Sequence, residues 1–325
     1  MSIINKIKSP IGEEMSKFEP SFRASMQTKV PLLNIITNYI LRRKGKQMRP
    51  MFVFLTSKML NSKVEDASYT AASLIELLHT ATLIHDDVVD EAYERRGFFS
   101  INALWKSKIS VLVGDYLLSK GLLLAVEKNE YELLKIVSVA VKEMSEGELL
   151  QIQQSRKLKI TEETYYEIIR KKTAALIAAC IACGAKSIGA DEKTVDRMHL
   201  LGEYVGMAFQ LKDDLLDYQN NGNIGKPSGN DIKEKKLTLP IIYVLKNASQ
   251  SDQKRILTIV KKHNKSKKKV HEVIDFVIAN GGIEYTTDKM HEYQQKALDI
   301  LAEIPSSDSK EALIELINYV VVRKK

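Results

Sequence analysis

The sequence predicts an all-α protein, and three observations carry that prediction. The first concerns proline: seven prolines stand at positions 10, 20, 31, 50, 227, 240 and 305, and none lies between Met51 and Lys226. The second is that this long segment is rich in Leu, Ala, Glu and Lys, which favour helices. The third is that apolar residues recur at i, i+3 and i+4 in 72–85, 136–150 and 200–216, while the alternating stretches typical of strands are scarce.

The domain organisation follows from length and from the breaks between helices. The chain has 325 residues, of which 44% are apolar and 28% charged, an ordinary globular balance. Glycine, proline, asparagine and serine mark breaks at 97–100, 220–230, 280–282 and 305–309. Because no repeat, low-complexity tract or linker separates the helices, we expect one domain over residues 1–325.

The net charge leaves several classes of partner open. It is +8, from 49 basic and 41 acidic residues, which suits nucleic acid, a membrane surface or a polyanionic small substrate. The densest basic run, 261–269, has no interleaved aromatic residues. It therefore predicts a solvated turn between helices rather than a nucleic-acid or anionic-lipid surface.

The two cysteines bear on the compartment. Cys180 and Cys183 form a C-x-x-C within the apolar stretch 173–185, and no second Cys/His pair lies nearby to complete a zinc site. We expect buried, inert thiols and a reducing, cytoplasmic compartment. The first ten residues lack the pattern of a signal peptide, and the stretch 173–185 is too short to span a bilayer, so no transmembrane segment is expected.

A first cluster of carboxylates follows an amphipathic helix directly. In the stretch 83–91, LIHDDVVDE, Asp86 and Asp90 share one helix face about 6 Å apart along the axis, with Asp87 between them. Like charges at this spacing repel, and partial desolvation adds to the cost. A divalent cation relieves both, and oxygen ligands without His or Cys suit Mg²⁺ rather than zinc. Taken alone, the pattern fits an acidic solvated helix end equally well.

The same D-D-x-x-D order then recurs. The stretch 209–217, FQLKDDLLD, contains Asp213, Asp214 and Asp217, again after an apolar helical run. Two such clusters on two helices can face each other across one cavity. Together they can hold several Mg²⁺ ions, which usually also bind substrate phosphates. A chance origin is much harder to maintain for two clusters than for one.

Basic residues accompany both clusters. Guanidinium forks and ammonium point charges both suit diphosphate oxygens. Each cation alone would be interpreted as a surface charge, but six carboxylates interleaved with such cations indicate metal-bridged diphosphate recognition. Neither a P-loop nor a G-x-S-x-G elbow is present, and His85 fits a packed histidine at least as well as a general base. The cations are Lys46, Arg49, Arg95, Arg96, Lys171, Lys172, Lys226, Lys235 and Lys236.

The ordered set of these residues resembles the trans-polyprenyl diphosphate synthases, including the octaprenyl diphosphate synthases, over residues 20–325. One departure is Lys235, where relatives often carry glycine before the lysine at 236. The matching blocks are GKQMRP (45–50), ELLHTATLIHDDVVD (76–90), RRG (95–97), VGD (113–115), GE (147–148), KT (172–173), FQLKDDLLD (209–217), GK (225–226), GND (229–231) and TLP (238–240).

The resemblance implies a fold and a set of residue roles. The fold is an all-α isoprenoid synthase helical bundle around a deep central cavity, usually in a homodimer. Thr173 and Gln210 would flank the reacting carbons, with Lys172 beside them. The Mg²⁺ ligands would be Asp86, Asp87, Asp90, Asp213 and Asp217, with Asp214 in support. The allylic diphosphate would be held by Arg95, Lys172, Lys226 and Lys236, and isopentenyl diphosphate by Lys46, Arg49, His79 and Arg96.

The activity that the resemblance implies is sequential, head-to-tail condensation of isopentenyl diphosphate onto an allylic diphosphate. Breaking the allylic carbon–oxygen bond separates charge, so Mg²⁺ and fixed cations stabilise the leaving group. Isopentenyl diphosphate is positioned with its double bond facing the cation, and a proton then leaves to the departing diphosphate. No protein nucleophile is needed, although water has to be excluded from the cation.

Product length is expected to depend on the residues one helical turn before the first cluster. Short-chain relatives often carry aromatic residues there, whereas this chain has Ala81 and Thr82, which favours a long product of about eight isoprene units. A farnesyl or geranylgeranyl diphosphate synthase and a non-catalytic subunit of a heteromeric synthase are the alternatives within the family. A class I terpene cyclase would carry an N-x-x-x-S-x-x-x-E type of second metal site instead. A nucleic-acid-binding protein would rest only on the net charge and the basic run 261–269.

Overall fold

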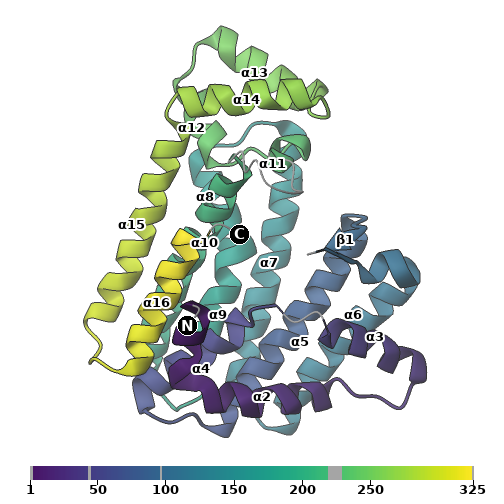
Figure 1. Cartoon of the computed structure of the whole chain (residues 1–325), viewed down its shortest axis with the longest axis vertical. Coiled ribbons are helices and arrows are strands. Elements are labelled where there is room, and N and C mark those ends of the chain that lie inside the picture. Colours follow the sequence, from purple (N-terminus) through teal and green to yellow (C-terminus); the bar gives the residue numbers. More distant parts are fainter. Residues whose placement is uncertain (1–2, 43–44, 96, 219–228, 324–325) are drawn as a thin grey trace. The chain divides into compact units, whose positions relative to one another are not determined.

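The structure, a computed structural model, describes residues 3–42, 45–95, 97–218 and 229–323, and it confirms the all-α prediction (Figure 1). The chain divides into two compact units, and of the five boundaries between them four fall within helices and one falls in a connection between two helices. Unit 1 comprises Met1–Val139, Ala179–His199 and Pro305–Leu313; unit 2 comprises Ala140–Ala178, Leu200–Ile304 and Ile314–Lys325.

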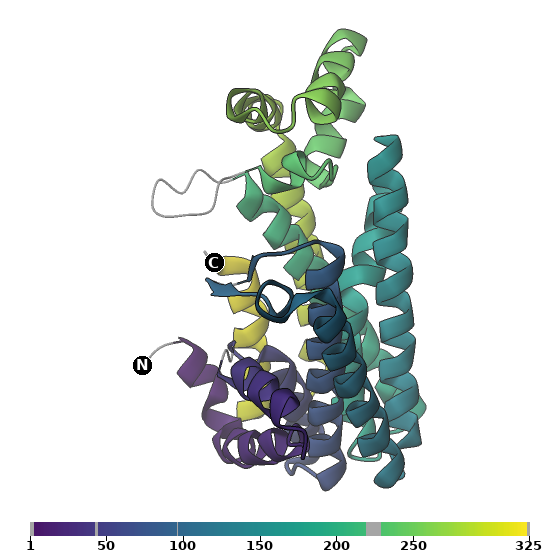
Figure 2. The same cartoon turned by 90° about the vertical axis from the view of Figure 1, so that its right-hand side faces the viewer.

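Unit 1 is built around a long pair of helices. Helices α5 (Asp66–Val89) and α6 (Ile101–Glu127) lie side by side (Figures 1 and 2). Leu74, Ile75 and Leu77 of α5 are fully buried in the core, and Val113 and Leu117 of α6 are buried as well. The other elements of unit 1 are α1 (Ile3–Lys8), the 3-10 turn η1 (Ser9–Ile11), α2 (Gly12–Ser25), α3 (Pro31–Leu41), α4 (Met48–Asn61) and the first turns of α7 (Tyr131–Lys157).

A tight hairpin joins α5 to α6 at the predicted break of 97–100. Strands β1 (Glu94–Arg95) and β2 (Phe98–Phe99) pair antiparallel, with Gly97 in the left-handed region at φ +79°. Ser100 then caps α6, because its hydroxyl accepts a hydrogen bond of 2.9 Å from the amide of Ala103. In the part of the chain that the structure describes, these two short strands are the only β-structure.

Unit 2 packs its helices around one apolar core. Buried side chains from α8 (Glu162–Ile169), α10 (Glu192–Asp217) and α12 (Leu239–Asn247) meet there, together with those of α13 (Gln250–Lys262), α14 (Lys267–Ala279) and α15 (Gly282–Ala302). Val321, from α16 (Asp308–Val322), completes the core. The remaining elements are the π-helical turn η2 (Arg170–Ala174), α11 (Asn230–Lys233) and the first turn of α9 (Ala175–Lys186), whose other residues belong to unit 1.

Two further predicted breaks are confirmed, and so is the prediction that both cysteines are buried. Helix α14 ends before Gly281, whose φ of +77° needs glycine, and α15 ends before the stretch 305–309. The break expected at 220–230 lies largely outside the described residues. Cys180 and Cys183 are free and fully buried, and burial raises the pKa of the Cys180 thiol to about 12.

Helix α6 is long and apolar, although the sequence analysis considered only the stretch 173–185 as a possible membrane span. The stretch 173–185 was expected to be the longest apolar run, but α6 is, by length and composition, the one described helix capable of crossing a bilayer. A core helix of a globular protein meets the same criterion, so this is weak support for a membrane span. Several apolar side chains of α6 face outward, with Leu112 58% and Leu123 52% exposed.

Candidate active site

The first aspartate cluster lies at the C-terminal end of α5, as predicted. Asp86 and Asp90 are exposed there, whereas Asp87 is buried and its backbone carbonyl accepts hydrogen bonds from Ala92 and Asn102. The C-terminus of a helix carries partial negative charge, and the last turn of α5 holds no basic residue. Carboxylates at this position destabilise the helix, which favours a role in binding a cation.

The VGD block of the resemblance has a packing explanation in α6. A Cβ atom added to Gly114 would lie 2.2 Å from Nε2 of His85, so only glycine lets the imidazole lie against α6. Nε2 of His85 is 3.2 Å from the carbonyl oxygen of Val111 and 3.5 Å from Oδ1 of Asp115. His85 is therefore a packed histidine beside the cluster, and it fixes the end of α5 against α6.

The other predicted binding residues of unit 1 are only partly described. Lys46 is exposed just before α4, after which Gln47 takes a left-handed conformation at φ +54°. Arg49 and His79 are half-buried on α4 and α5. The side chain of Arg95 and all of Arg96 lie outside the described residues, as does Lys226 of unit 2. Their predicted roles stay predictions.

The second aspartate cluster ends α10, and each of its three carboxylates has a different environment. Asp213 is 41% exposed and accepts an ion-paired hydrogen bond of 2.7 Å from Arg323, the residue that follows α16. The guanidinium of Arg323 also lies 3.9 Å from the centre of the Phe209 ring. Asp217 instead accepts backbone hydrogen bonds of 2.9 and 3.0 Å from Asn230 and Asp231, and so caps α11.

Asp214 is the buried member of the cluster, with 2% of its surface exposed. Its Oδ2 accepts a hydrogen bond of 2.6 Å from the hydroxyl of Tyr165, and its Oδ1 accepts one of 2.8 Å from Nε2 of Gln210. Oε1 of Gln210 in turn accepts a hydrogen bond of 2.7 Å from the hydroxyl of Thr173. Burial, with the nearby Asp231 carboxylate, raises the pKa of Asp214 well above its ordinary value.

This chain of hydrogen bonds joins two predicted catalytic residues to one buried anchor. Tyr165 and Gln210 use one oxygen each of Asp214, so the amide of Gln210 has a fixed orientation. Its oxygen then faces Thr173. The sequence predicted Thr173 and Gln210 as a pair beside the reacting carbons, and the structure brings them together within unit 2.

The turn that carries Lys172 and Thr173 is π-helical. The five residues of η2 interrupt the α8–α9 path, and single π turns of this kind occur frequently at functional sites. A Cβ atom on Gly147 would lie 2.7 Å from the backbone nitrogen of Lys172, so glycine permits this close approach of α7 to η2. The ammonium of Lys172 pairs with Glu148 and donates a hydrogen bond of 2.6 Å to Gln151. The GE block is thus explained by contact with the KT block.

A small cavity of about 110 Å³, with both polar and apolar lining residues, lies where these residues meet. It has room for about three or four water molecules, the scale of a polar head group rather than of a polyprenyl chain. The deep central cavity therefore stays a prediction. The cavity is lined by Gln151, Gln154, Ser155, Ile160, Tyr165, Ile168, Ile169, Lys172, Thr173, Gln210, Asp214, Asp231, Lys236, Leu237 and Thr238.

Two titratable residues of this cavity are electrostatically perturbed. Burial, reinforced by the Asp217 carboxylate, raises the pKa of Asp231 to about 7. Burial lowers the pKa of Lys236, but two nearby carboxylates outweigh it and raise that pKa above its ordinary value. They are those of Glu234, which lies 2.5 Å from the Lys236 ammonium, and Asp231. Lys236 therefore stays cationic in a cavity suited to an anionic group.

Four residues of the site were not singled out from the sequence. Glu148 and Asp231 stand within the matching blocks, and their types and places there were available as a signal. Tyr165 and Arg323 stand outside every block, and only the contacts with Asp214 and Asp213 identify them.

The donors at the two clusters suit a hard divalent cation, although no group of three or more His, Cys, Asp or Glu residues is preassembled among the described residues. Asp86, Asp90, Asp213 and Asp217 offer only carboxylate oxygens, the ligands that Mg²⁺ prefers. Mg²⁺ usually takes one or two carboxylates and completes its shell with water and substrate phosphate. Scattered carboxylates at two helix ends fit that mode.

An all-α chain with two aspartate clusters at helix ends and a cation-lined cavity defines a class of enzymes that act on prenyl diphosphates. A model of the polyprenyl synthetase family matches residues 30–277. The chain is 33% identical over 323 residues to the octaprenyl diphosphate synthase of Escherichia coli (strain K12), with 99% of each chain covered.

Two solved structures have the same fold. One is the polyprenyl synthase from Caulobacter crescentus CB15 complexed with calcium and isoprenyl diphosphate, with a TM-score of 0.90 and 31% identity over 99% of this chain and 98% of that chain. The other is the geranylgeranyl pyrophosphate synthase from Bacteroides thetaiotaomicron, with a TM-score of 0.85 and 39% identity over 99% of this chain and 100% of that chain.

The chain belongs to the polyprenyl synthetase family. It is a prenyltransferase, a polyprenyl diphosphate synthase with the all-α isoprenoid synthase fold. Its substrates are isopentenyl diphosphate and an allylic diphosphate. The sequence-based predictions of family, fold class and enzyme class are confirmed.

Proposed function

We propose that this chain is an Mg²⁺-dependent synthase of a long all-trans polyprenyl diphosphate of about eight isoprene units. The observation that carries the proposal is the cavity of unit 2, where Lys172, Lys236, Thr173 and Gln210 converge beside the second aspartate cluster. Two ammonium groups suit a diphosphate, and a neutral hydroxyl and amide suit a developing carbocation, which a nucleophile would trap.

Mg²⁺ would be held by Asp86 and Asp90 of α5 and by Asp213 and Asp217 of α10. It would supply positive charge to the diphosphate leaving group. Asp214 is better suited to holding Gln210 in place, since both of its oxygens already accept hydrogen bonds. Arg323 holds the Asp213 carboxylate and offsets part of the charge that the cluster concentrates.

The chain's own residues would act by binding, orienting and excluding water. Lys172 and Lys236 would hold the allylic diphosphate, with Glu148 and Glu234 orienting the two ammonium groups before substrate arrives. Thr173 and Gln210 would turn their oxygens toward the cationic carbons and stabilise them as fixed dipoles. Lys46, Arg49 and His79 would position isopentenyl diphosphate.

The proposed product length rests on two small residues of α5. Ala81 is 2% exposed and Thr82 is half-buried with its hydroxyl bonded to the carbonyl of His79. Neither presents an aromatic barrier one turn before Asp86. A geranylgeranyl product is the second candidate, because the Bacteroides thetaiotaomicron relative, at 39% identity, is a geranylgeranyl pyrophosphate synthase.

A homodimer is proposed from the exposed apolar face of α6. Val111, Leu112, Leu122, Leu123 and Val126 are each between 39% and 58% exposed, which is unusual for so many large apolar residues of one helix. A second copy of the chain would bury this face. Sedimentation velocity tests the proposal: Leu112→Glu with Leu123→Glu should convert a dimer into a monomer.

The cytoplasm is the proposed compartment, and no bilayer span is proposed. Free, buried Cys180 and Cys183 support a reducing environment. The partly buried α6 is assigned to the dimer interface and not to a membrane. Fractionation of cells tests this assignment, because recovery of the chain only after detergent extraction would contradict it.

The deciding experiment is turnover with labelled isopentenyl diphosphate and farnesyl diphosphate, followed by mass analysis of the product. We expect activity with Mg²⁺, none after EDTA, and recovery when Mg²⁺ is restored. Asp86→Ala and Asp213→Ala should each abolish most turnover while keeping helicity. A normal rate in EDTA would reject the metal assignment, and a product of four isoprene units would select the second candidate.

A further inference from the structure

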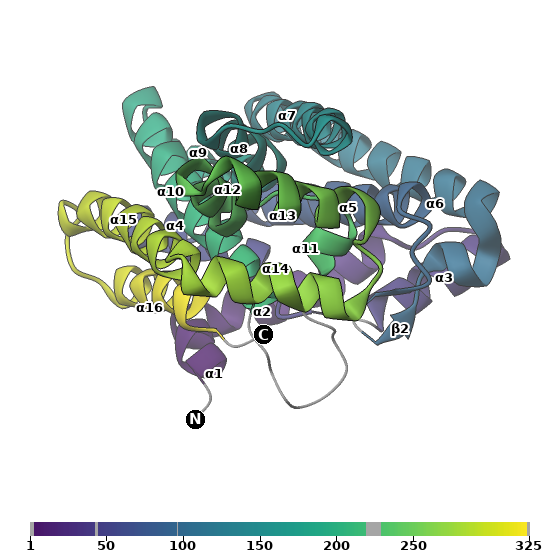
Figure 3. The ribbon, with the colours of Figure 1, turned by 90° about the horizontal axis from the view of Figure 1, so that it is seen from above.

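The turn between α13 and α14 carries a dense cluster of lysines. Helix α13 ends in Lys261 and Lys262, and α14 begins at Lys267, so the basic run 261–269 surrounds a short connection (Figures 1 and 3). The sequence reading expected a solvated turn. The five exposed lysines of this run, here called the lysine turn, are Lys261, Lys262, Lys265, Lys267 and Lys268.

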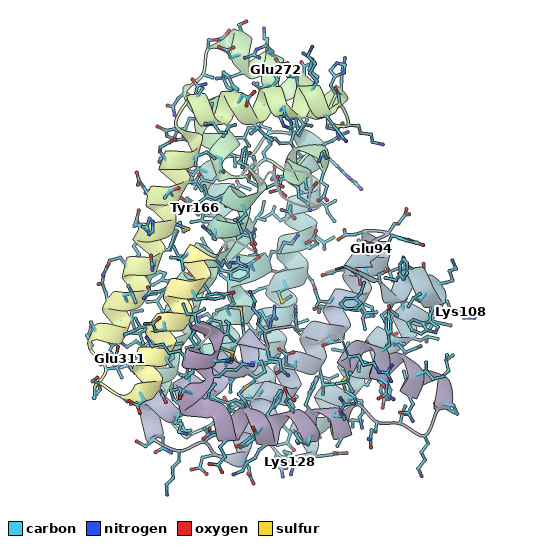
Figure 4. All side chains as sticks on the ribbon, in the orientation of Figure 1. Glu94, Lys108, Lys128, Tyr166, Glu272 and Glu311 are labelled. Atoms are coloured by element: carbon cyan, nitrogen blue, oxygen red, sulfur yellow. The ribbon has the colours of Figure 1, made fainter. Side chains whose placement is uncertain are left out.

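The lysine turn is not neutralised by its own surroundings. None of its five ammonium groups forms an ion pair within the described residues, although charged neighbours on α13 and α14 do so. Lys269 pairs with Glu272 at 2.8 Å, and Arg255 pairs with Glu272 at 2.6 Å and with Asp252 at 3.1 Å. Figure 4 labels Glu272 on α14. The local acids therefore serve other cations and leave the turn with five uncompensated positive charges.

Helix stability does not explain this arrangement. The N-terminus of α14 carries partial positive charge, yet its first turn holds three lysines and no acid, and Ser266 gives it no side-chain cap. Neighbouring like charges also repel across the connection. An acidic first turn would stabilise α14, so the lysines are unfavourable for folding and suited to an external anion.

The lysine turn is also held in a fixed position beside the active-site cavity. Asn264 is buried, and its Nδ2 donates a hydrogen bond of 2.5 Å to the carbonyl of Lys233, three residues before Lys236. Val270 and Ile274 pack α14 onto the core of unit 2. The charges therefore stand on a rigid platform joined to the segment that lines the cavity.

We propose that the lysine turn docks this synthase onto a bilayer surface rich in anionic phospholipid. A cluster of uncompensated lysines on one convex turn matches a plane of negative head groups. The established product supplies the second argument: a polyprenyl chain is apolar throughout, so its favourable destination from the enzyme is a bilayer. Single-stranded nucleic acid fits less well, because exposed aromatic residues for stacking are missing from 261–269.

Docking of this kind is reversible and sensitive to salt. Each lysine near an anionic surface raises the membrane partition coefficient about fivefold, so five lysines together should raise it by at least about two orders of magnitude. A polybasic patch without a lipid anchor is a single signal, which gives exchange between membrane and solution rather than permanent attachment. The proposal is independent of metal identity and product length.

The test is co-sedimentation of the full chain with phosphatidylcholine vesicles that contain or lack 30% phosphatidylglycerol, without substrate. The test variant changes all five lysines of the turn to glutamine. A matched control removes the same charge from five exposed lysines elsewhere, through Lys29→Gln, Lys63→Gln, Lys128→Gln, Lys159→Gln and Lys193→Gln. Figure 4 labels one of these, Lys128, at the end of α6. Prenyl transfer in solution checks that both variants are folded.

We expect wild type and control to bind the anionic vesicles and to be released by about 0.5 M salt, which shortens the screening length to a few ångströms. The lysine-turn variant should bind at least a hundredfold more weakly, with normal turnover in solution. Equal binding by the two variants would overturn the proposal, as would binding to neutral vesicles alone. Preference of the turn for mixed-sequence single-stranded RNA over anionic vesicles would overturn it in favour of a nucleic-acid surface.

Discussion

Tyr165→Phe is the sharpest perturbation of the active site, because it deletes one oxygen and changes little else. The hydroxyl of Tyr165 donates a hydrogen bond of 2.6 Å to Asp214, and Tyr165 is only 3% exposed, within the core of unit 2. After the substitution, the buried carboxylate keeps only its hydrogen bond from Gln210. The Asp214 carboxylate and the Gln210 amide then gain freedom to rotate, and Thr173 loses its fixed partner.

The expected magnitude follows from the burial of Asp214. Leaving a buried acceptor without its hydrogen bond costs about 1–3 kcal/mol, so the substitution should destabilise the fold by that order. A loss of 1 kcal/mol lowers Tm by about 2–4 °C in a unit of this size. If the same energy also orients Gln210 in the transition state, kcat falls roughly ten- to a hundredfold. The KM for isopentenyl diphosphate should change little.

The neighbouring tyrosine is a matched control. The hydroxyl of Tyr166 is buried and makes no hydrogen bond within the described residues, and its ring packs 5.9 Å from that of Tyr293. Tyr166→Phe removes the same atom one residue away, so it should be neutral or slightly stabilising and leave kcat unchanged. A general effect of removing a hydroxyl from α8 would appear in both variants.

The assay measures Tm, kcat and KM for both substrates in the two variants and in Asp214→Asn. An asparagine at 214 can still accept from Nε2 of Gln210 through its oxygen, while its nitrogen would face the Tyr165 hydroxyl, so both variants weaken the same contact between positions 165 and 214. The double variant Tyr165→Phe with Asp214→Asn should therefore lose less than the sum of the single losses. A Tyr165→Phe enzyme with a kcat within twofold of wild type would refute the positioning argument, whatever its Tm.

Three further predictions test other parts of the site. Gly147→Ala places a Cβ atom 2.7 Å from the backbone of Lys172, so it should destabilise the fold by about 1–3 kcal/mol and lower kcat. Gly121→Ala is the control and should be tolerated, because its Cβ atom meets leucine side chains at 3.4 Å. Equal effects of the two variants on Tm would contradict the close-approach argument. The raised pKa of Asp231, about 7, means that the folded state holds a proton between pH 4 and 7 that the unfolded state releases, so stability falls as pH rises through that window. Without metal, Asp231→Asn should raise Tm by about 10 °C at pH 8 and hardly at pH 4, and a pH-independent gain would exclude this titration. Thr82→Phe, at a half-buried position one turn before Asp86, should shorten the product to three or four isoprene units in a folded enzyme, and an unchanged product would place the growing chain elsewhere.

Ala81 shows how the structure changes the choice of variant. The sequence placed Ala81 and Thr82 together as the positions that set product length. Ala81 is 2% exposed, so a phenylalanine there meets packed neighbours and overpacks the core. Thr82 lies only about 40° around the helix from Asp86, whereas Ala81 lies about 140° away. Tertiary packing therefore selects Thr82 for the first test.

The sequence by itself determined the fold class, the family and the two aspartate clusters. Those features depend on local information: helical periodicity, proline placement, and the order of short motifs along the chain. The ends of α5 and α10 coincide with the clusters, because both the apolar face of a helix and the acidic residues that follow it can be recognised from neighbouring residues in the sequence. Gly147 and Lys172 were both singled out from the sequence, in two separate motifs. The sequence did not show that the two residues approach each other closely.

Only the tertiary structure decided which carboxylate does what. Asp213, Asp214 and Asp217 are equivalent in the motif, yet one is held by Arg323, one is buried beneath Tyr165 and Gln210, and one caps α11. The partners of Asp213 and Asp214 are 110 and 49 residues away in the sequence, and no local pattern encodes such contacts. A carboxylate's role depends on its burial and on the donors around it, and both are properties of packing rather than of sequence order.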